Sequence, residues 1–107
     1  MYKRFLALIL IFTSSTAFAG TAIGHVTSII VANNQDTVLF KVNTGIHNTP
    51  KCNETGQFAI HLDKPGGMAT YMALLTAKQK GFTIMADGTR GCSGNWKSED
   101  LRTLRLN

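Results

Sequence analysis

Three histidines and six carboxylates are the residues of this chain that could do acid–base or metal chemistry. His25, His47 and His61 lie far apart in the sequence, and no two of them have the short spacing that is typical of a metal site. His61 lies opposite the face shared by Phe58 and Ile60, which predicts a partly exposed strand residue. The sequence therefore predicts no metal site and no bound cofactor.

The carboxylates fall mostly in polar segments, where turn and cap formers are expected rather than a catalytic pair. They are Asp36, Glu54, Asp63, Asp87, Glu99 and Asp100. A serine nucleophile is no better supported, because "GCSGN" around Ser93 only loosely resembles the Gly-x-Ser-x-Gly elbow of hydrolases. We therefore expect a protein that is not an enzyme.

Cys52 and Cys92 are the two cysteines, and in an exported chain a single pair is expected to form a disulfide. Such a bridge would close a loop of about 40 residues and contribute roughly 3–4 kcal/mol on the chain-entropy model. The alternative is a pair of free or metal-bound thiols, for which no further ligand lies at a suitable spacing.

A loop near the C-terminus carries the best candidates for ligand binding. Trp96 lies in "SGNWKSED" beside Lys97 and shortly after Arg90, a combination that could stack on a sugar or an aromatic group. Tyr71, on the expected helix, is a fourth candidate. The alternatives are that Trp96 folds back over the core, that Tyr71 lies at the core edge, or that either lies at a subunit contact.

The N-terminal segment, residues 1–19, has the pattern of a secretory signal peptide. Lys3 and Arg4 precede an apolar run, and Ala17-Phe18-Ala19 places small residues at the two positions that a signal peptidase reads. Cleavage after Ala19 would leave residues 20–107 as one domain, exported across the inner membrane to the periplasm or the exterior. The apolar run is shorter than the about 20 residues that span a bilayer, so no membrane insertion is expected.

The charge of the mature chain gives little support to nucleic-acid binding. Without Lys3 and Arg4, the 11 basic residues fall to 9, against 6 acidic ones, for a net charge of +3. These charges are spread along the chain and form no basic run of the kind that follows phosphates.

Five short strands and one helix are expected to build this domain. The strands are rich in β-branched and alternating apolar residues, and the first two read as a hairpin. The expected strands are Ala22–Ala32, Thr37–Val42, Gln57–Leu62, Phe82–Ala86 and Leu101–Leu106. A helix between the third and fourth strands is the order of the five-stranded Greek-key barrel called the OB-fold. A sheet with the helix across one face is the alternative.

The helix is expected to begin near Pro65, with Asp63 capping its first amides, and to end at Gly81. Met68, Tyr71, Met72 and Leu75 fall at helical spacing, with Leu74 beside them. "KPGG" at its start lacks the longer glycine loop and the closing Lys-Ser/Thr of a nucleotide site. The glycines are therefore interpreted as room for the chain to pass from strand to helix.

The mature chain resembles a family of small exported bacterial proteins in the order and spacing of its motifs. These are a cysteine-bearing loop, the stretch "FAIHLDKPGGMATYMALLTAKQKGFTI" after it, then "GTRGCS" and a closing "LRTLRL". That family is related to the B subunit of subtilase cytotoxin. The resemblance covers most of the mature chain and implies an OB-type barrel. The toxin relatives form ring pentamers and bind cell-surface glycans, but their sugar-contacting residues could not be matched one by one to positions in this chain.

These observations predict an exported binding module, similar to a toxin B subunit, whose ligand is a glycan or a protein and which assembles into a homo-oligomeric ring. The alternative is a periplasmic inhibitor or interaction protein that acts on an exported enzyme. Single-strand nucleic-acid binding would rest on the fold alone, and the scarcity of aromatic residues on the strands argues against it.

Overall fold

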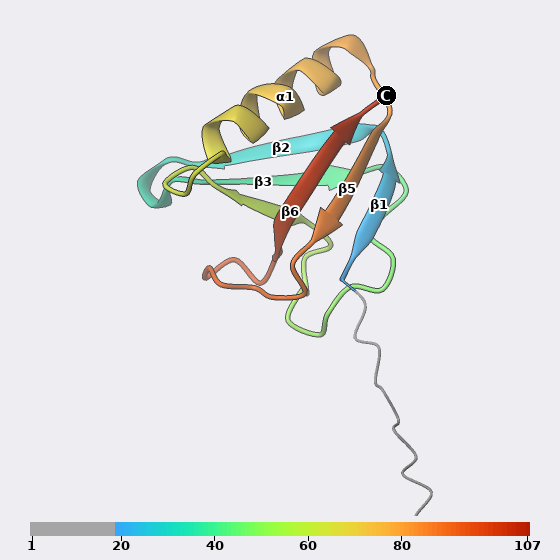
Figure 1. The fold of residues 1–107 in the computed structure, drawn as a ribbon. Helices are drawn as coiled ribbons and strands as arrows, with labels where there is room; N and C mark the ends of the chain where they lie inside the picture. The colour runs from blue at the N-terminus through green and yellow to red at the C-terminus, as the bar shows by residue number, and fades with distance from the viewer. Residues whose placement is uncertain (1–18) are drawn as a thin grey trace, which may run out of the picture.

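The computed structural model describes residues 19–107, so the segment interpreted as a signal peptide lies almost entirely outside it. Six strands form one curled sheet, and a single α-helix covers one end (Figure 1). The elements are β1 (Thr21–Gly24), β2 (Val26–Ala32), a 3₁₀ turn (Asn33–Gln35), β3 (Thr37–Val42), β4 (Phe58–His61), α1 (Gly67–Lys80), β5 (Ile84–Gly88) and β6 (Glu99–Leu106). The predicted class, mainly β with one helix between the strand-rich halves, is confirmed.

The prediction of five strands was wrong, because the first expected strand is two strands separated by His25. β1 pairs with β5 at one end of the sheet, and β2 pairs with β3 at the other. The backbone of His25 exchanges bonds with Asn43, whose amide donates to the His25 carbonyl at 2.9 Å and whose Oδ1 accepts from the His25 amide at 2.9 Å. These bonds redirect the chain from one edge of the sheet to the other.

The strand order is β1-β5-β6-β4-β3-β2, with every neighbouring pair antiparallel except β4 and β6. The predicted hairpin is confirmed as β2 and β3. Inside the curl lies a core in which Phe40 and Phe58 pack with their ring centres 5.6 Å apart. The other buried residues of this core are Ala22, Val26, Val38, Val42, Ile60, Leu74, Ala77, Ile84 and Ala86.

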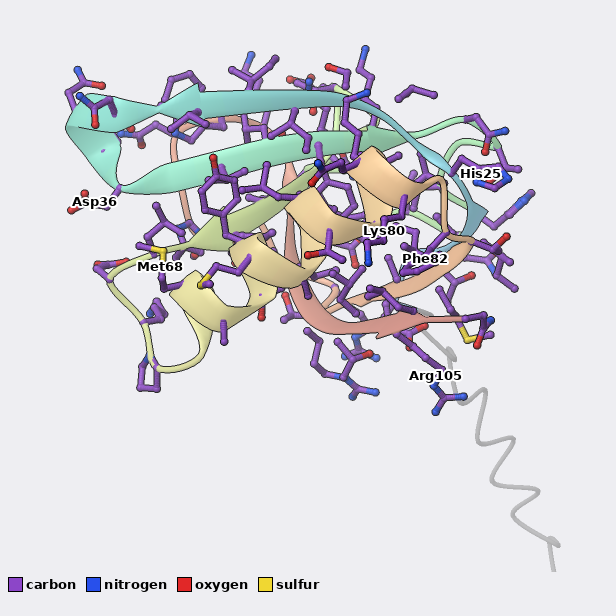
Figure 2. The ribbon with its side chains drawn as sticks, turned by 90° about the horizontal axis from the view of Figure 1, so that it is seen from above. His25, Asp36, Met68, Lys80, Phe82 and Arg105 are labelled. Carbon is purple, nitrogen blue, oxygen red and sulfur yellow. A yellow bond between two sulfur atoms is a disulfide. The ribbon has the colours of Figure 1, made fainter. Side chains whose placement is uncertain are left out.

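The helix buries a different face from the one that its apolar residues suggest. Leu74 and Ala77 are buried against the core, and Tyr71 packs at its edge. Met68 and Met72 remain 53% and 61% exposed. Figure 2, which looks down on α1, shows Met68 near the start of the helix and Lys80 near its end. An apolar stripe is therefore left on the outer side of α1.

The start of α1 explains the two glycines of "KPGG". Gly66 precedes the helix with φ +80°, a left-handed conformation that favours glycine. Gly67 lies so close to the backbone of His61 that a Cβ would collide with it. These features support the interpretation that the two glycines give the chain room to pass from strand to helix. The expected cap by Asp63 is not formed, because no side chain makes a capping hydrogen bond at the start of α1. Gly81 ends the helix as predicted, with φ +71°.

The predicted disulfide between Cys52 and Cys92 is confirmed, and the alternative of free thiols is wrong. It joins the loop before β4 to the loop between β5 and β6. A hydrogen bond of 2.6 Å between the hydroxyls of Thr55 and Ser98 ties the same two loops together. Within residues 19–107, no helix is long and apolar enough to cross a membrane.

Candidate functional site

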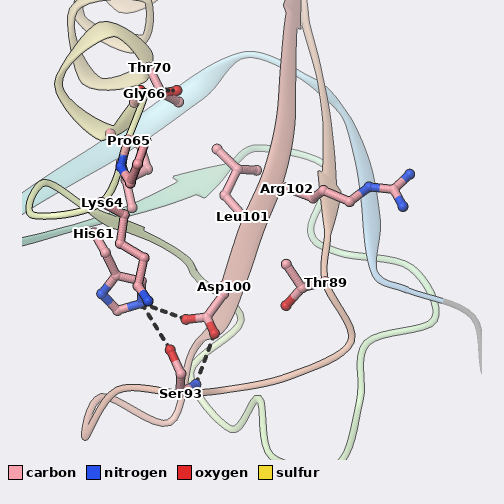
Figure 3. A pocket seen from close by; sticks show the side chains of 12 residues that line it. His61, Lys64, Pro65, Gly66, Thr70, Thr89, Ser93, Asp100, Leu101 and Arg102 are labelled. Carbon is pink, nitrogen blue, oxygen red and sulfur yellow. Dashed lines mark hydrogen bonds and ion pairs between the residues drawn. The ribbon is translucent and has the colours of Figure 1, made fainter.

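Two adjoining hollows lie beside the start of α1, on the side of the sheet where β4 and β6 run parallel. The larger hollow has a volume of about 570 Å³ and the smaller about 310 Å³. His61, Lys64 and Ser93 line both of them, which makes this trio the boundary between the two hollows. Figure 3 shows the residues that line the larger hollow. We therefore take the paired hollows as the candidate site.

Three segments bring the side chains of this boundary together. His61 is the last residue of β4, and Asp100 is the second residue of β6. The parallel register pairs Ala59 with Asp100. His61 lies two residues after Ala59, on the same face of β4, and its side chain contacts Asp100 across the strands. Ser93 belongs to the loop 89–98, which the disulfide at the preceding residue, Cys92, holds in place. The site is thus built by the curled sheet and the loop 89–98, which the disulfide holds.

His61, Ser93 and Asp100 form a hydrogen-bonded group, named here the His61 cluster. The Nε2 atom of His61 lies 2.6 Å from Asp100 Oδ1 and 3.3 Å from Ser93 Oγ. The backbone amide of Ser93 donates to Asp100 Oδ2 at 2.9 Å. Because a carboxylate oxygen only accepts, the short contact places a proton on Nε2. The other ring nitrogen, Nδ1, lies 3.5 Å from Thr37 Oγ1, a weak contact.

The Asp100 carboxylate is held in its charged form. Its burial alone would raise its pKa, but hydrogen bonds from His61 and from the hydroxyl and amide of Ser93 outweigh that effect, and the positive charge that His61 can carry adds to them. The pKa of Asp100 is therefore lowered below its ordinary value. At neutral pH this places a fixed negative charge in the lining of the larger hollow, beside the boundary residues His61 and Ser93.

The His61 cluster contains the residue types of a hydrolytic triad, but its serine and carboxylate are arranged differently around the imidazole ring. In a triad, one ring nitrogen takes the serine proton while the carboxylate holds the other nitrogen. Here Asp100 and Ser93 both face Nε2, whose proton is directed at Asp100. Nε2 therefore cannot accept a proton from Ser93 in this arrangement, and the cluster orients His61 and the loop rather than activating a nucleophile.

Trp96 lines the smaller hollow, next to His61 and Lys64. Its ring is only partly exposed, and its Nε1 is buried without a hydrogen-bond partner in the described part of the chain. The partly buried Trp96 therefore forms one wall of the smaller hollow.

The other three candidates lie outside the lining of both hollows. Lys97 forms an exposed ion pair of 3.1 Å with Glu54. The backbone of Arg90 has φ +76° and donates its amide to Glu99. Tyr71 packs at the edge of the core, as the more conservative reading expected. The structure thus brings Trp96 to the candidate site and does not bring Arg90, Lys97 or Tyr71 there.

Sequence reasoning missed Asp100 and Ser93, and it assigned the carboxylates to turns too broadly. Asp87 is a residue of β5, and Glu99 and Asp100 begin β6 instead of preceding it. Glu99 is fully buried. The parallel pairing of β4 with β6 places the start of β6 beside His61, and no local sequence pattern reveals this pairing.

Within residues 19–107, no group of three or more His, Cys, Asp or Glu side chains could hold a metal ion. Comparisons of the chain with protein-family models, with curated proteins and with solved structures found no match in any of the three.

Proposed function

We propose that this protein is a non-enzymatic, exported binding module, similar to a toxin B subunit, whose ligand is a glycan held in the paired hollows around His61. The observation that carries the proposal is the mixture of groups at the site. Hydroxyls of Thr70, Thr89 and Ser93 and the amine of Lys64 surround the larger hollow, while an indole ring forms a wall of the smaller one.

This mixture matches the chemistry of a sugar. Sugar hydroxyls need hydrogen-bond donors and acceptors, whereas the C–H face of a sugar ring packs on an aromatic side chain. The charged Asp100 is already bonded on both oxygens, so it holds His61 and Ser93 in position for the ligand. The order of bonds in the His61 cluster favours binding over hydrolysis.

We also propose that the sheet is an OB-type barrel whose first strand is interrupted at His25. If β1 and β2 are counted as one strand, the chain order is three strands, one helix and two strands, as in that fold. The parallel contact of β4 with β6 and the covering helix support this assignment. Export is supported by the disulfide, because such bonds persist in oxidising compartments.

A ring of identical subunits remains part of the proposal. The exposed apolar stripe of α1, with Met68, Met72 and Leu75, is the surface that would best support such contacts. Light scattering on residues 20–107 should give several times the monomer mass. A monomer would remove the ring from the proposal and favour the inhibitor alternative.

The site is tested by glycan-array binding of residues 20–107 and of two matched lysine variants. Lys64 lines both hollows, whereas Lys80 lies at the far end of α1. Lys64→Ala should weaken binding about tenfold, the effect of one lost hydrogen bond to a charged group. Lys80→Ala should bind as the wild type. Equal binding by the wild type and Lys64→Ala would contradict the site.

Trp96→Ala separates the two hollows. If a sugar ring stacks on the indole, the variant should also lose about tenfold in affinity while its unfolding curve in urea stays cooperative. Unchanged binding would remove Trp96 from the site and confine the ligand to the larger hollow. The absence of any glycan binding, together with a tight complex with one exported hydrolase, would favour the inhibitor.

A further inference from the structure

The buried carboxyl group of Glu99 has an environment that the proposed binding function does not use. Its Oε2 atom accepts hydrogen bonds from the backbone amides of Gly20 at 2.9 Å and of Arg90 at 3.0 Å. Among residues 19–107, no group donates a hydrogen bond to its Oε1 atom, which is buried. A buried carboxyl oxygen without a partner is costly, which indicates that a donor belongs beside it.

The space around this carboxyl group is shaped by two glycines. A Cβ at Gly20 or at Gly88 would collide with the Glu99 side chain. Gly20 is also fixed from its other side, because its carbonyl accepts from the Gly88 amide at 2.8 Å. The next residue, Thr21, exchanges two backbone bonds with His47. The nitrogen of Gly20 is therefore held against Glu99 by the sheet itself.

Gly20 is also the residue that the signal-peptide pattern places first in the mature chain. Hydrolysis of the Ala19–Gly20 peptide bond by a signal peptidase consumes one water. It leaves a carboxylate on Ala19 and an amino group on Gly20, which is largely protonated at neutral pH. Before cleavage the Gly20 nitrogen has one proton to donate, and after cleavage it has three and a positive charge.

We infer that the α-ammonium group of Gly20, created by cleavage after Ala19, forms a buried ion pair with Glu99 and so completes the fold. One ammonium proton keeps the bond to Oε2, and another can reach the unpartnered Oε1. The precursor buries the same carboxyl group with neutral amide donors only, and it is therefore the less stable form. This inference rests on the proposed export and not on the proposed ligand.

The test compares three forms of the mature domain by unfolding in urea. The first begins with a free Gly20 amine, the second is acetylated on that amine, and the third retains Ala19. Removing one partner of a buried ion pair is strongly destabilising. We expect the equilibrium constant for unfolding to rise about a hundredfold in the second form and to rise also in the third. Equal stability of the free and acetylated forms would overturn the inference.

Glu99→Gln provides the matched control, because it keeps the shape of the side chain and removes its charge. In this background, the difference between free and acetylated amines should fall to within about threefold. If the free and acetylated forms of Glu99→Gln still differ in stability as the wild-type forms do, acetylation destabilises the protein through the size of the acetyl group and not through the loss of a charge beside residue 99. That result would also overturn the inference.

Two measurements on the wild type keep the test decisive if Glu99→Gln does not fold. In the folded protein the Gly20 amine should react with acetic anhydride far more slowly than the exposed lysines. Labelling at the rate of those lysines would contradict a buried ion pair. The intact mass of the exported protein should correspond to a chain starting at Gly20. A different first residue would refute the inference and the cleavage site together, whereas a loss of glycan binding would affect neither.

Discussion

Two neighbouring carboxylates at the start of β6 lie in different surroundings. Glu99 is fully buried and holds the amides of Gly20 and Arg90, at the junction of β5, β6 and the N-terminal segment. Asp100 has a side chain 15% exposed and holds His61 and Ser93 at the edge of the paired hollows. Successive residues of a strand point to opposite faces, so one short acidic pair serves two sites.

The two carboxylates differ in their access to the hollows. Glu99 lines neither of them, and Gly20 and Gly88 pack so closely against its side chain that a Cβ at either position would collide with it. Asp100 lines the larger hollow, and its partners His61 and Ser93 line both hollows, where a ligand could touch them. A carboxylate is therefore better judged by the groups that face it than by its position in the sequence.

Loss of the disulfide should give the largest decrease in the free energy of unfolding. It should also affect the Asp100 site more than the Glu99 site. Cys52→Ser removes a bridge that closes a loop with a sequence separation of 40. The free energy of unfolding should fall by about 4 kcal/mol on the chain-entropy model. Urea unfolding with the reduced wild type as a control measures this fall. An unchanged midpoint would show that the bridge adds no stability.

Hydrogen exchange on the same variant shows where the loss falls. The amide of Ser93 is bonded to Asp100 and adjoins Cys92, so its protection should decrease most. The amide of Gly88, bonded to the Gly20 carbonyl beside Glu99, should keep much of its protection. Equal loss at both amides would mean that the two sites open as one cooperative unit.

The second prediction compares the two carboxylates directly. Glu99→Ala leaves two buried backbone donors without an acceptor, at a cost of about 3 kcal/mol. Asp100→Ala should cost about 1–2 kcal/mol, because water can reach the donors that it leaves behind. Urea titrations of both variants measure the difference. Asp100→Ala as the more damaging change would reverse the assignment of roles.

The sequence alone was sufficient for the elements that local patterns specify. β3 has the predicted bounds, because Val38, Phe40 and Val42 alternate between clear turn formers. The helix end was found because Gly81 and the lysines before it mark a C-terminus. The division of the first strand at His25 escaped prediction, because the Asn43 bonds that cause it come from a distant loop.

The candidate site was harder to predict for the same physical reason. Trp96 was found because its residue type is informative by itself. The His61 cluster joins residues 61, 93 and 100, which only the strand order and the disulfide bring together. The buried face of α1 was also not predicted. Met68 and Met72 are exposed, but they are as apolar as Leu74 and Ala77, which are the residues that the helix buries. Nonlocal pairing, and not residue type, decided these outcomes.

The smallest expected effect is the dependence of stability on pH that Asp100 contributes. Its pKa is lower in the folded protein than in the unfolded chain, so its bonds to His61 and Ser93 add stability at neutral pH. That stability is fully present above the unfolded pKa of about 3.9 and is lost as the pH falls through the lower folded value. Asp100→Asn should therefore be less stable than the wild type at pH 7, by about 1 kcal/mol.

The gap between the two proteins should close in acid, where the wild-type carboxyl becomes neutral like the amide. Unfolding in urea at pH 7, 5, 4 and 3 measures this convergence. Glu99→Gln is the control, since it should leave the acid dependence due to Asp100 in place. A gap that stays constant from pH 7 to pH 3 would mean that the charge on Asp100 does not hold the His61 cluster. The cluster would then be held by shape and by the disulfide at Cys92, and the distinction between the two carboxylates would rest on burial alone.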